Sequence, residues 1–404
     1  MKIVIDLQGA QSESRFRDIG RYAMAITKAI IKNKSDEDEI ILALNGLFQD
    51  TIEPIRAEFD ELLPQENIRV WSAPGPLKAC EQGNDYRRDI AERIREAFLA
   101  SLNPDIILVA SLFEGYVDDA ATSIGILEKI PTAVILYDLI PYADQKNYLD
   151  NNPLYKKHYL KKIEYLKKAD LLLAISDYSK QEAVELLGFD EQKIESIYAA
   201  CEDFFKKINI SNSDKENLLS KLNITKDFIL YTGGENNRKN LSSLIKAFSM
   251  LEKNIRRTHQ IVIAGRFPDG NIKELQNLAK ETGLEKSELI FTGYISDDEL
   301  VKLYNLCKLF VLPSFREDFG LPLLEAMACG AATITSNTTS LSEVAGRGDM
   351  LFDPYSVESI VRKMQEVLSD EGFRKDLIQY GLNRAKEFSL DKSAKLALEA
   401  LRKL

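Results

Sequence analysis

The chain has 404 residues and a formal net charge of −10, a length that predicts two or three domains. An acidic chain lacks the basic field that matches nucleic-acid phosphates, which argues against general binding to DNA or RNA. No apolar run reaches the roughly 18 residues of a membrane span, and Asp6 interrupts the first apolar stretch, so we expect no signal peptide and a cytoplasmic protein.

The first half of the chain alternates short apolar runs with amphipathic stretches. Residues 3–7 are typical of a buried strand, and residues 19–32 follow with apolar side chains at helical spacing. Further strands of this kind are predicted at 40–44, 106–110, 133–137 and 171–175. Apolar strands between helices are typical of a parallel sheet that is covered on both faces.

The second half repeats this alternation. Strands are predicted at 228–231, 260–264, 289–291, 309–312 and 332–335. Helical patterns separate them at 241–251, 297–306 and 322–329. Strand and helix alternating twice over predict an α/β protein with two doubly wound, Rossmann-like domains.

The two series are separated by a polar stretch within 204–226, which carries a helix start signal at Asp214. We therefore predict a first domain at 1–205 and a second at 206–385. A final helix is expected within 386–404.

The cysteines and histidines do not indicate a metal centre. Four cysteines are scattered without a C-x-x-C pair, and the two histidines are His158 and His259. Neither a zinc site nor a Ser-His or Cys-His catalytic pair is expected. We interpret both histidines as solvated helix or loop residues.

Two glycine-bearing turns follow predicted strands and can bring backbone amides close to an anion. In the first, Gly20 lies where the helix after residues 3–7 opens, a pattern for which an ordinary turn is the commoner explanation. In the second, a Gly-Gly pair ending at Gly234 precedes Arg238 and Lys239. Because helix starts prefer acids, paired cations there indicate an anion site at the carboxyl edge of the sheet.

The stretch 314–330 is the most informative part of the chain. Pro322 suits the first position of a helix, so the amides of Gly320 and Leu321 are expected to point outward. Glu317 lies in the loop before this helix, and Glu325 is expected in its first turn. Two glutamates eight residues apart, on either side of a Phe-Gly-Leu-Pro turn, form an unusual arrangement.

These motifs resemble the family-4 retaining glycosyltransferases of the GT-B fold. The matching stretches include E-x7-E from Glu317 to Glu325, and G-G-E-N-N-R-K-N with Arg238 and Lys239. F-T-G-Y with S-D-D-E-L, S-L-S-E-V-A-G and L-F-D-P match too. In the first half, D-L-Q-G-A-Q, G-R-Y, S-L-F-E-G and Y-D-L-I-P are similar to bacterial polysaccharide mannosyltransferases, especially those of O-antigen.

The resemblance implies two domains facing across a cleft, with a nucleotide-sugar donor mainly on the second. It implies that Arg238 and Lys239 hold the diphosphate, that Glu325 binds the ribose hydroxyls and that Glu317 contacts the donor sugar. Two cations and a helix N-terminus can stabilise the charge that grows on the leaving diphosphate. We therefore expect a metal-independent enzyme without a cofactor.

Other donor contacts follow from the same resemblance. The amides of Gly320 and Leu321 are expected at the phosphate or sugar, and Gly234 at the diphosphate turn. The backbone around Tyr294 is expected at the base, and the loop of Gly20 at the diphosphate from the first domain. Such enzymes are generally described as using front-face return, in which the leaving phosphate helps to deprotonate the acceptor.

The first domain departs from the family pattern at one position. Many members carry a histidine at the end of a first-domain strand, where this chain has Tyr137-Asp138. Asp138 is our candidate for the corresponding contact with the donor sugar, and capping of the following turn is an equally good explanation. Glu114, in S-L-F-E-G, is a weaker candidate on the acceptor side.

Two charged stretches have competing explanations. Residues 155–168 contain six lysines and one acid, Glu164, so a basic amphipathic helix can rest on the inner membrane, although a solvated face is the commoner case. Its apolar side would include Ile163 and Leu166. The D-x-D pattern that ends at Asp38 matches the metal motif of another glycosyltransferase fold, and we interpret it as solvated surface.

The leading hypothesis is a retaining α-mannosyltransferase that moves mannose from GDP-mannose to a lipid-linked bacterial surface polysaccharide such as O-antigen. A UDP-sugar-dependent transferase is the alternative within the family, and a sugar-nucleotide epimerase has no matching pattern. A non-catalytic nucleotide-sugar-binding subunit is the alternative from another class. The complete set of Arg238, Lys239, Glu317 and Glu325 argues against this last alternative.

Overall fold

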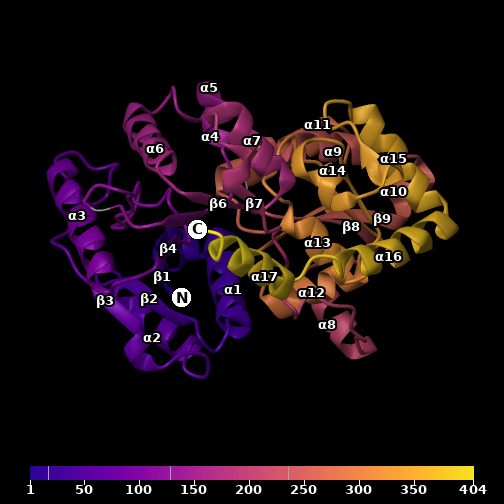
Figure 1. Cartoon of the computed structure of the whole chain (residues 1–404). Helices are drawn as coiled ribbons and strands as arrows, with labels where there is room; N and C mark the ends of the chain where they lie inside the picture. The colour runs from indigo at the N-terminus through magenta and orange to yellow at the C-terminus, as the bar shows by residue number, and fades with distance from the viewer. Residues whose placement is uncertain (17, 128, 235) are drawn as a thin grey trace. The chain divides into compact units, whose positions relative to one another are not determined.

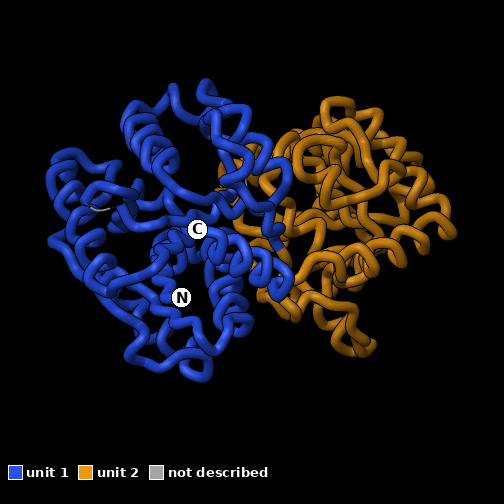
Figure 2. The backbone as a smooth tube through the Cα atoms, viewed as in Figure 1, with its two compact units in different colours: residues 1–199, 390–404 blue, residues 200–389 orange. Residues whose placement is uncertain are grey.

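The computed structural model describes residues 1–16, 18–127, 129–234 and 236–404. The chain forms two compact units, Met1–Ala199 with Leu390–Leu404 (unit 1) and Ala200–Ser389 (unit 2) (Figures 1 and 2). The boundary predicted at residue 205 therefore lies inside unit 2. Most of the predicted C-terminal helix belongs to unit 1 rather than forming a separate part.

Unit 1 is built on one seven-stranded parallel sheet of order β3-β2-β1-β4-β5-β6-β7 (Figure 1). Its strands are β1 Lys2–Asp6, β2 Glu39–Asn45, β3 Ile68–Trp71, β4 Ile106–Val109, β5 Thr132–Leu136, β6 Leu171–Ala174 and β7 Ile194–Ser196. The five predicted strands are confirmed. The prediction missed β3, an edge strand whose two central residues are exposed, and β7, which has only three residues.

Helices lie on both faces of this sheet, as a continuously apolar parallel strand requires. They are α1 Asp18–Asn33, α2 Gln49–Glu58, α3 Asp85–Ser101, α4 Ile140–Ala143, α5 Gln145–Tyr148, α6 Pro153–Leu166, α7 Asp177–Leu187 and α17 Leu390–Leu401. Helix α17 packs on α1 through buried residues such as Ala394, Ala397 and Leu398. This packing explains why the end of the chain joins unit 1.

Unit 2 contains a six-stranded parallel sheet of order β10-β9-β8-β11-β12-β13. Its strands are β8 Asp227–Thr232, β9 His259–Ala264, β10 Leu289–Gly293, β11 Leu309–Leu312, β12 Thr333–Ser336 and β13 Leu351–Phe352. The five predicted strands are again confirmed, and the prediction missed the two-residue β13. Both sheets are therefore doubly wound, as the alternation of strand and helix predicted.

The described helices of unit 2 are α8 Asn212–Lys221, α9 Leu241–Ser249, α10 Lys253–Thr258, α11 Asp269–Glu281, α12 Asp297–Leu306, α13 Leu321–Ala328, α14 Thr339–Ala345, α15 Val357–Ser369 and α16 Glu371–Ala385. The helical stretches predicted at 241–251, 297–306 and 322–329 correspond to three of them, α9, α12 and α13. Helix α12 has the predicted bounds because Ser296 and Glu299 form a capping box at its start. The start signal at Asp214 belongs to α8, whose cap is Ser211.

The lysines of α6 are used inside unit 1. Lys161 pairs with Asp89 at 2.7 Å and with Glu92 at 2.8 Å, both on α3, and Lys162 is fully buried 3.4 Å from Glu92. Ile163 and Leu166 lie in the apolar core. The apolar side, which the membrane hypothesis considered from the sequence would place on the bilayer, therefore lies in the core of unit 1.

Two further interpretations from the sequence are wrong for one residue each. His158 is buried on α6 rather than solvated, and burial together with the charges of Lys162 and Arg88 lowers its pKa to about 2. Asp38, which ends the D-x-D pattern, is also buried and lies 2.7 Å from the guanidinium of Arg402. Asp38 is therefore part of a structural ion pair with Arg402, near the C-terminus, and is not a solvated surface residue.

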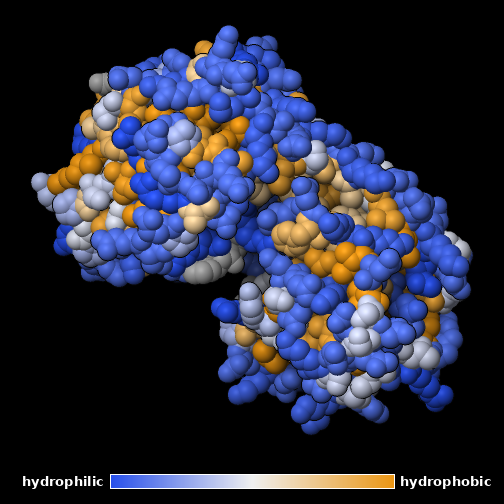
Figure 3. All heavy atoms as spheres, turned by 90° about the horizontal axis from the view of Figure 1, so that it is seen from below, coloured by the Kyte–Doolittle hydropathy of each residue, from blue (hydrophilic) through white to orange (hydrophobic). Residues whose placement is uncertain are grey.

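Among the residues that the structure describes, no helix combines the length and the apolarity of a membrane span. The face drawn in Figure 3 carries hydrophobic side chains interspersed among hydrophilic ones.

Candidate functional site

Each sheet has one place where the strand order reverses, and ligands of doubly wound sheets bind at the carboxyl ends of the strands there. In unit 2 this place lies between β8 and β11, because β9 and β10 extend the sheet to one side and β12 and β13 to the other. The loop after β8 carries Arg238 and Lys239 in a short 3-10 turn, Asn237–Lys239. The loop after β11 carries Glu317.

Backbone geometry holds these two loops together. The amide of Phe315 donates to the carbonyl of Arg238 at 2.7 Å. Asn240 adopts a left-handed conformation with φ of 57° at the cap of α9. Its buried side chain donates to the carbonyls of Pro313, at 3.0 Å, and Pro354, at 2.9 Å. One asparagine thus joins the loops after β8, β11 and β13.

Glu317 is the centre of the site. Its carboxylate lies 2.5 Å from Arg238 Nη1 and 2.7 Å from Lys239 Nζ, and it accepts a bond from Ser314 Oγ at 2.6 Å. The Glu317 side chain is 2% exposed, whereas Arg238 and Lys239 are 23% and 11% exposed. A buried anion therefore orients two cations that retain access to solvent, and one positive charge remains in excess.

Burial alone would raise the pKa of Glu317, but the charges of Lys239 and Arg238 outweigh it and lower the pKa to about 2. The carboxylate is thus ionised at neutral pH. The start of α14 contributes to its placement, because Thr339 Oγ1 accepts from the Glu317 amide and Ser340 Oγ donates to its carbonyl.

This pKa predicts how stability depends on pH. Because the pKa is lower in the folded protein than the ordinary 4.5, Glu317 stabilises the fold above pH 4.5, and the contribution of about 3 kcal/mol is lost between pH 4.5 and 2. Denaturant unfolding of wild type and Glu317→Gln across this range measures it. The difference in the free energy of unfolding between wild type and Glu317→Gln is expected to shrink as the pH falls. A difference that is equal at pH 7 and pH 2 would contradict the prediction.

The start of α13 differs in detail from the expected one. Gly320 is the N-cap, with a left-handed φ of 87°, and a Cβ there would lie 2.5 Å from the side chain of Leu341. A larger residue would therefore strain the backbone and also clash with Leu341. Leu321 begins the helix and Pro322 follows it. Glu325 was predicted in the first turn of this helix, but it lies beyond that turn. Its carboxylate accepts a bond at 2.9 Å from the buried hydroxyl of Tyr304.

The remaining predicted donor residues of unit 2 lie at the same edge of the sheet. Tyr294 follows β10, is 72% exposed and has the guanidinium of Arg266 5.0 Å from its ring centre. A Cβ at Gly234 would meet nothing within 4 Å, so its backbone borders open space. Glu235, part of the same motif, lies outside the described residues.

In unit 1 the strand order reverses between β1 and β4, and the loops after these strands meet at Glu114. The buried carboxylate accepts bonds from Ser12, Ser14 and Ser111 at 2.8, 3.0 and 2.6 Å. Burial raises the pKa of Glu114 more than these hydroxyl donors lower it. Glu114 thus ties the loop after β1 to the loop after β4.

Gly20 and Asp138 have clear local roles. A Cβ at Gly20, in the first turn of α1, would lie 2.4 Å from the carbonyl of Ser14, so the preceding loop lies directly on the helix. Asp138 Oδ1 accepts from the amide of Ile140 at 2.8 Å, which is the turn-capping arrangement considered from the sequence. A donor contact by Asp138 stays a prediction.

Reasoning from the sequence missed three residues that build the site. Ser314 bonds to Glu317, Asn240 joins the loops, and Tyr304 holds Glu325 while bonding to Thr232 at 2.7 Å. Ser314 follows a predicted strand, a signal that was available. Within the described ranges, no group of three or more His, Cys, Asp or Glu side chains is placed to hold a metal ion.

Comparison with known proteins identifies relatives of both units. Residues 214–384 match the family model described as glycosyl transferases group 1. The serotype-specific mannosyltransferase WbdA of Escherichia coli is 37% identical over 407 residues, which cover 100% of this chain and 48% of WbdA. O-antigen chain mannosyltransferase B of Escherichia coli is 32% identical over 244 residues, or 60% of this chain and 62% of that protein. The chain thus spans about half the length of WbdA.

Solved structures show the fold. HepE of Anabaena, determined in complex with UDP-glucose, superposes with a TM-score of 0.71 at 16% identity, and 100% of both chains is covered. The two doubly wound sheets are thus those of the GT-B fold. Residues 214–384 therefore match the glycosyl transferases group 1 family, and the whole chain is similar to the serotype-specific mannosyltransferase WbdA.

Proposed function

We propose that this chain is a glycosyltransferase that moves mannose from GDP-mannose to a lipid-linked bacterial surface glycan, with retention of configuration. The single observation that carries the proposal is the ion-pair cluster of Arg238, Lys239 and Glu317 where the strand order of unit 2 reverses. A cluster with one excess positive charge at this edge suits a diphosphate.

The chemistry follows from where charge develops. Breaking the bond between the anomeric carbon and the diphosphate leaves negative charge on the leaving oxygen. Arg238 and Lys239 are already oriented by Glu317, so they stabilise this charge with little reorganisation. The amides at the start of α13, next to Gly320, add the positive end of a helix. In this mechanism the buried Glu317 positions the two cations and does not act as a proton donor.

Mannose as the transferred sugar is supported by the similarity to WbdA and O-antigen chain mannosyltransferase B, which are mannosyltransferases. The choice of guanine as the base of the donor is based on the family resemblance. UDP is the second candidate because HepE, which has the same fold, was determined with UDP-glucose. Independence from metals is proposed because the two cations can take the charge that a metal would otherwise neutralise.

A non-catalytic nucleotide-sugar-binding subunit is the competing function. A binder gains little from two cations aimed at the leaving oxygen, since stabilisation of the transition state is useful only for catalysis. Transfer of radiolabelled mannose from GDP-mannose to a membrane-extracted glycan lipid separates the two functions.

Thermal unfolding with saturating GDP, UDP or ADP, without added metal, tests the donor site directly. A nucleotide at 100 times its dissociation constant adds about 2.7 kcal/mol of stability. We expect GDP to raise the melting temperature, and GDP-mannose to do the same. Stabilisation by UDP instead would overturn the donor assignment, and no response to any nucleotide would count against the site itself.

A further inference from the structure

Helix α12 places a fully buried tyrosine, Tyr304, between β8 and α13 of unit 2. Its ring makes edge contacts with Phe310 and Phe205, with ring centres 5.5 Å and 6.1 Å apart. Its hydroxyl lies 2.7 Å from Thr232 Oγ1, at the end of β8, and 2.9 Å from the carboxylate of Glu325 on α13. One phenol thus connects the elements on either side of the place where the strand order reverses.

The hydrogen of this phenol points at Glu325. A carboxylate can only accept, so the Tyr304 hydroxyl donates to Glu325 and accepts the hydrogen of Thr232. Burial and the negative charge of Glu325 raise the pKa of Tyr304 above its usual range, so the phenol keeps this hydrogen at neutral pH. A hydrogen bond to an ionised group is about twice as strong as one between neutral groups. The bond therefore fixes one oxygen of the carboxylate.

Glu325 lies where this buried pair meets solvent. Glu325 is partly exposed, whereas Tyr304 and Thr232 are buried. A glutamate that is not held in this way loses rotamer freedom when it binds a ligand. Tyr304 removes part of that freedom on folding, so less is lost on binding. The carboxylate is thus oriented before a ligand arrives.

The part of a nucleotide sugar that suits Glu325 is a pair of neighbouring hydroxyls. A carboxylate accepts from hydroxyls and repels phosphate, and its two oxygens match a vicinal diol. The proposed diphosphate site, Arg238 and Lys239, lies in the loop that begins after Thr232. The ribose is bonded directly to that diphosphate. Acidic side chains bind ribose hydroxyls in this way at the strand ends of other doubly wound sheets.

We propose that Tyr304 is a positioning residue for the donor, because its hydrogen bond holds the Glu325 carboxylate in the orientation that accepts from the ribose hydroxyls. This inference rests on the proposed function, since it takes the ligand to be a nucleotide sugar. Thr232 contributes by orienting the phenol. GDP and UDP share the ribose, so the role of Tyr304 does not depend on the base.

Isothermal titration calorimetry with GDP and with 2′,3′-dideoxy-GDP, which lacks both ribose hydroxyls, tests this role. Tyr304→Phe is expected to weaken GDP binding about tenfold, the factor for one lost bond to a charged group. Its affinity for dideoxy-GDP is expected to equal that of the wild type, a difference between ligands that a loss of folded protein does not produce. In a Glu325→Ala background, Tyr304→Phe is expected to change nothing, because the tyrosine acts through the carboxylate.

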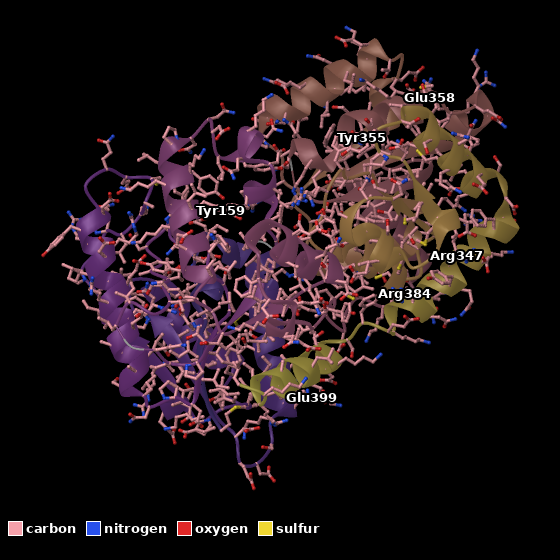
Figure 4. The ribbon with its side chains drawn as sticks, turned by 45° about the horizontal axis from the view of Figure 1, so that its top comes forward. Tyr159, Arg347, Tyr355, Glu358, Arg384 and Glu399 are labelled. Carbon is pink, nitrogen blue, oxygen red and sulfur yellow. The ribbon has the colours of Figure 1, made fainter. Side chains whose placement is uncertain are left out.

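Transfer kinetics give a second readout. Tyr304→Phe is expected to raise the KM for GDP-mannose about tenfold and to leave kcat unchanged, as for a contact made equally in the ground and transition states. The matched control is Tyr165→Phe on α6, the helix that carries the labelled Tyr159 in Figure 4. Tyr165 also donates to a glutamate, Glu92 at 2.8 Å, but that carboxylate is buried and paired with lysines. This control should leave every nucleotide affinity unchanged.

Three results would contradict the role of Tyr304. The first two are an unchanged affinity of Tyr304→Phe for GDP and an equal loss for both nucleotides, since the tyrosine is then only part of the core. A loss for GDP-mannose without a loss for GDP would assign the carboxylate to the sugar and overturn the ribose assignment. If Tyr304→Phe does not fold, Thr232→Val replaces it, with about threefold weaker GDP binding expected and unchanged binding overturning the inference.

The proposed function can fail separately. A wild type that binds UDP or ADP instead of GDP removes the GDP-mannose assignment, and the same comparison with the dideoxy form of that nucleotide decides on Tyr304. A wild type that binds GDP but transfers no mannose removes the transfer, while the calorimetry still supports or overturns the role of Tyr304. If the wild type binds no nucleotide, the inference is overturned together with the donor site.

Discussion

Replacing Lys239 by Ala is expected to lower the rate of mannose transfer by about 10²–10³-fold, the usual loss when one preorganised donor to a developing charge is removed. The ammonium group lies 2.7 Å and 3.0 Å from the two oxygens of Glu317. Its removal takes away half of the cationic pair and leaves Glu317 with Arg238 alone. Initial rates at saturating GDP-mannose measure the loss in kcat.

The control for this variant is Lys246→Ala, which removes an exposed lysine of the same unit from the last turn of α9. It is expected to leave transfer unchanged. Lys239→Arg distinguishes charge from geometry, because a guanidinium keeps the charge but has a different shape. Turnover by Lys239→Ala equal to that of the wild type would remove Lys239 from the catalytic machinery.

The largest expected effect on stability comes from Arg95→Ala in unit 1. Arg95 on α3 is 1% exposed and lies 2.6 Å from Asp6, which is also 1% exposed at the end of β1. Removing one partner leaves a buried unpaired charge, and this typically costs about 3–5 kcal/mol. The cavity that the large buried Arg95 side chain leaves behind adds to the loss of stability. Denaturant unfolding at pH 7 measures the change in the free energy of unfolding.

Arg95→Met with Asp6→Asn is the matched double variant. It removes both charges while it keeps most of the volume, so it is expected to be more stable than Arg95→Ala. If Arg95→Ala is within about 1 kcal/mol of the wild type, the pair is not the electrostatic anchor that its burial indicates. Asp6 also accepts from Gln8 at 3.0 Å, so the variant should loosen the loop after β1.

Much of the fold was predictable because its signals are local. Short, mainly apolar runs marked ten of the thirteen strands, counted over the described residues. The three that were missed, β3, β7 and β13, are short or lie at a sheet edge with exposed residues, so they bury too little to leave a pattern. The predicted range of α12, 297–306, is also that of the structure, and its start is fixed by a capping box that spans four residues.

The buried charges were not predictable in this way. The sequence of 155–168 shows six lysines but not that Lys162 packs against Glu92 of α3, seventy residues away. Asp38 and His158 look like ordinary surface residues in the sequence, but Asp38 pairs with Arg402 and His158 is buried beside Tyr116. A long-range partner changes a residue from solvated to buried, and a local pattern carries no information about that partner.

The sequence by itself determined the α/β class, the two doubly wound sheets and the motifs that carry Arg238, Lys239 and Glu317, because periodicity and short motifs are properties of neighbouring residues. Tertiary structure decided what those residues do to one another. Only the meeting of the β8 and β11 loops makes Glu317 the buried partner of Arg238 and Lys239. Only the three-loop junction at Asn240 brings Tyr355 onto Phe315, since strands adjacent in a parallel sheet are far apart in the chain.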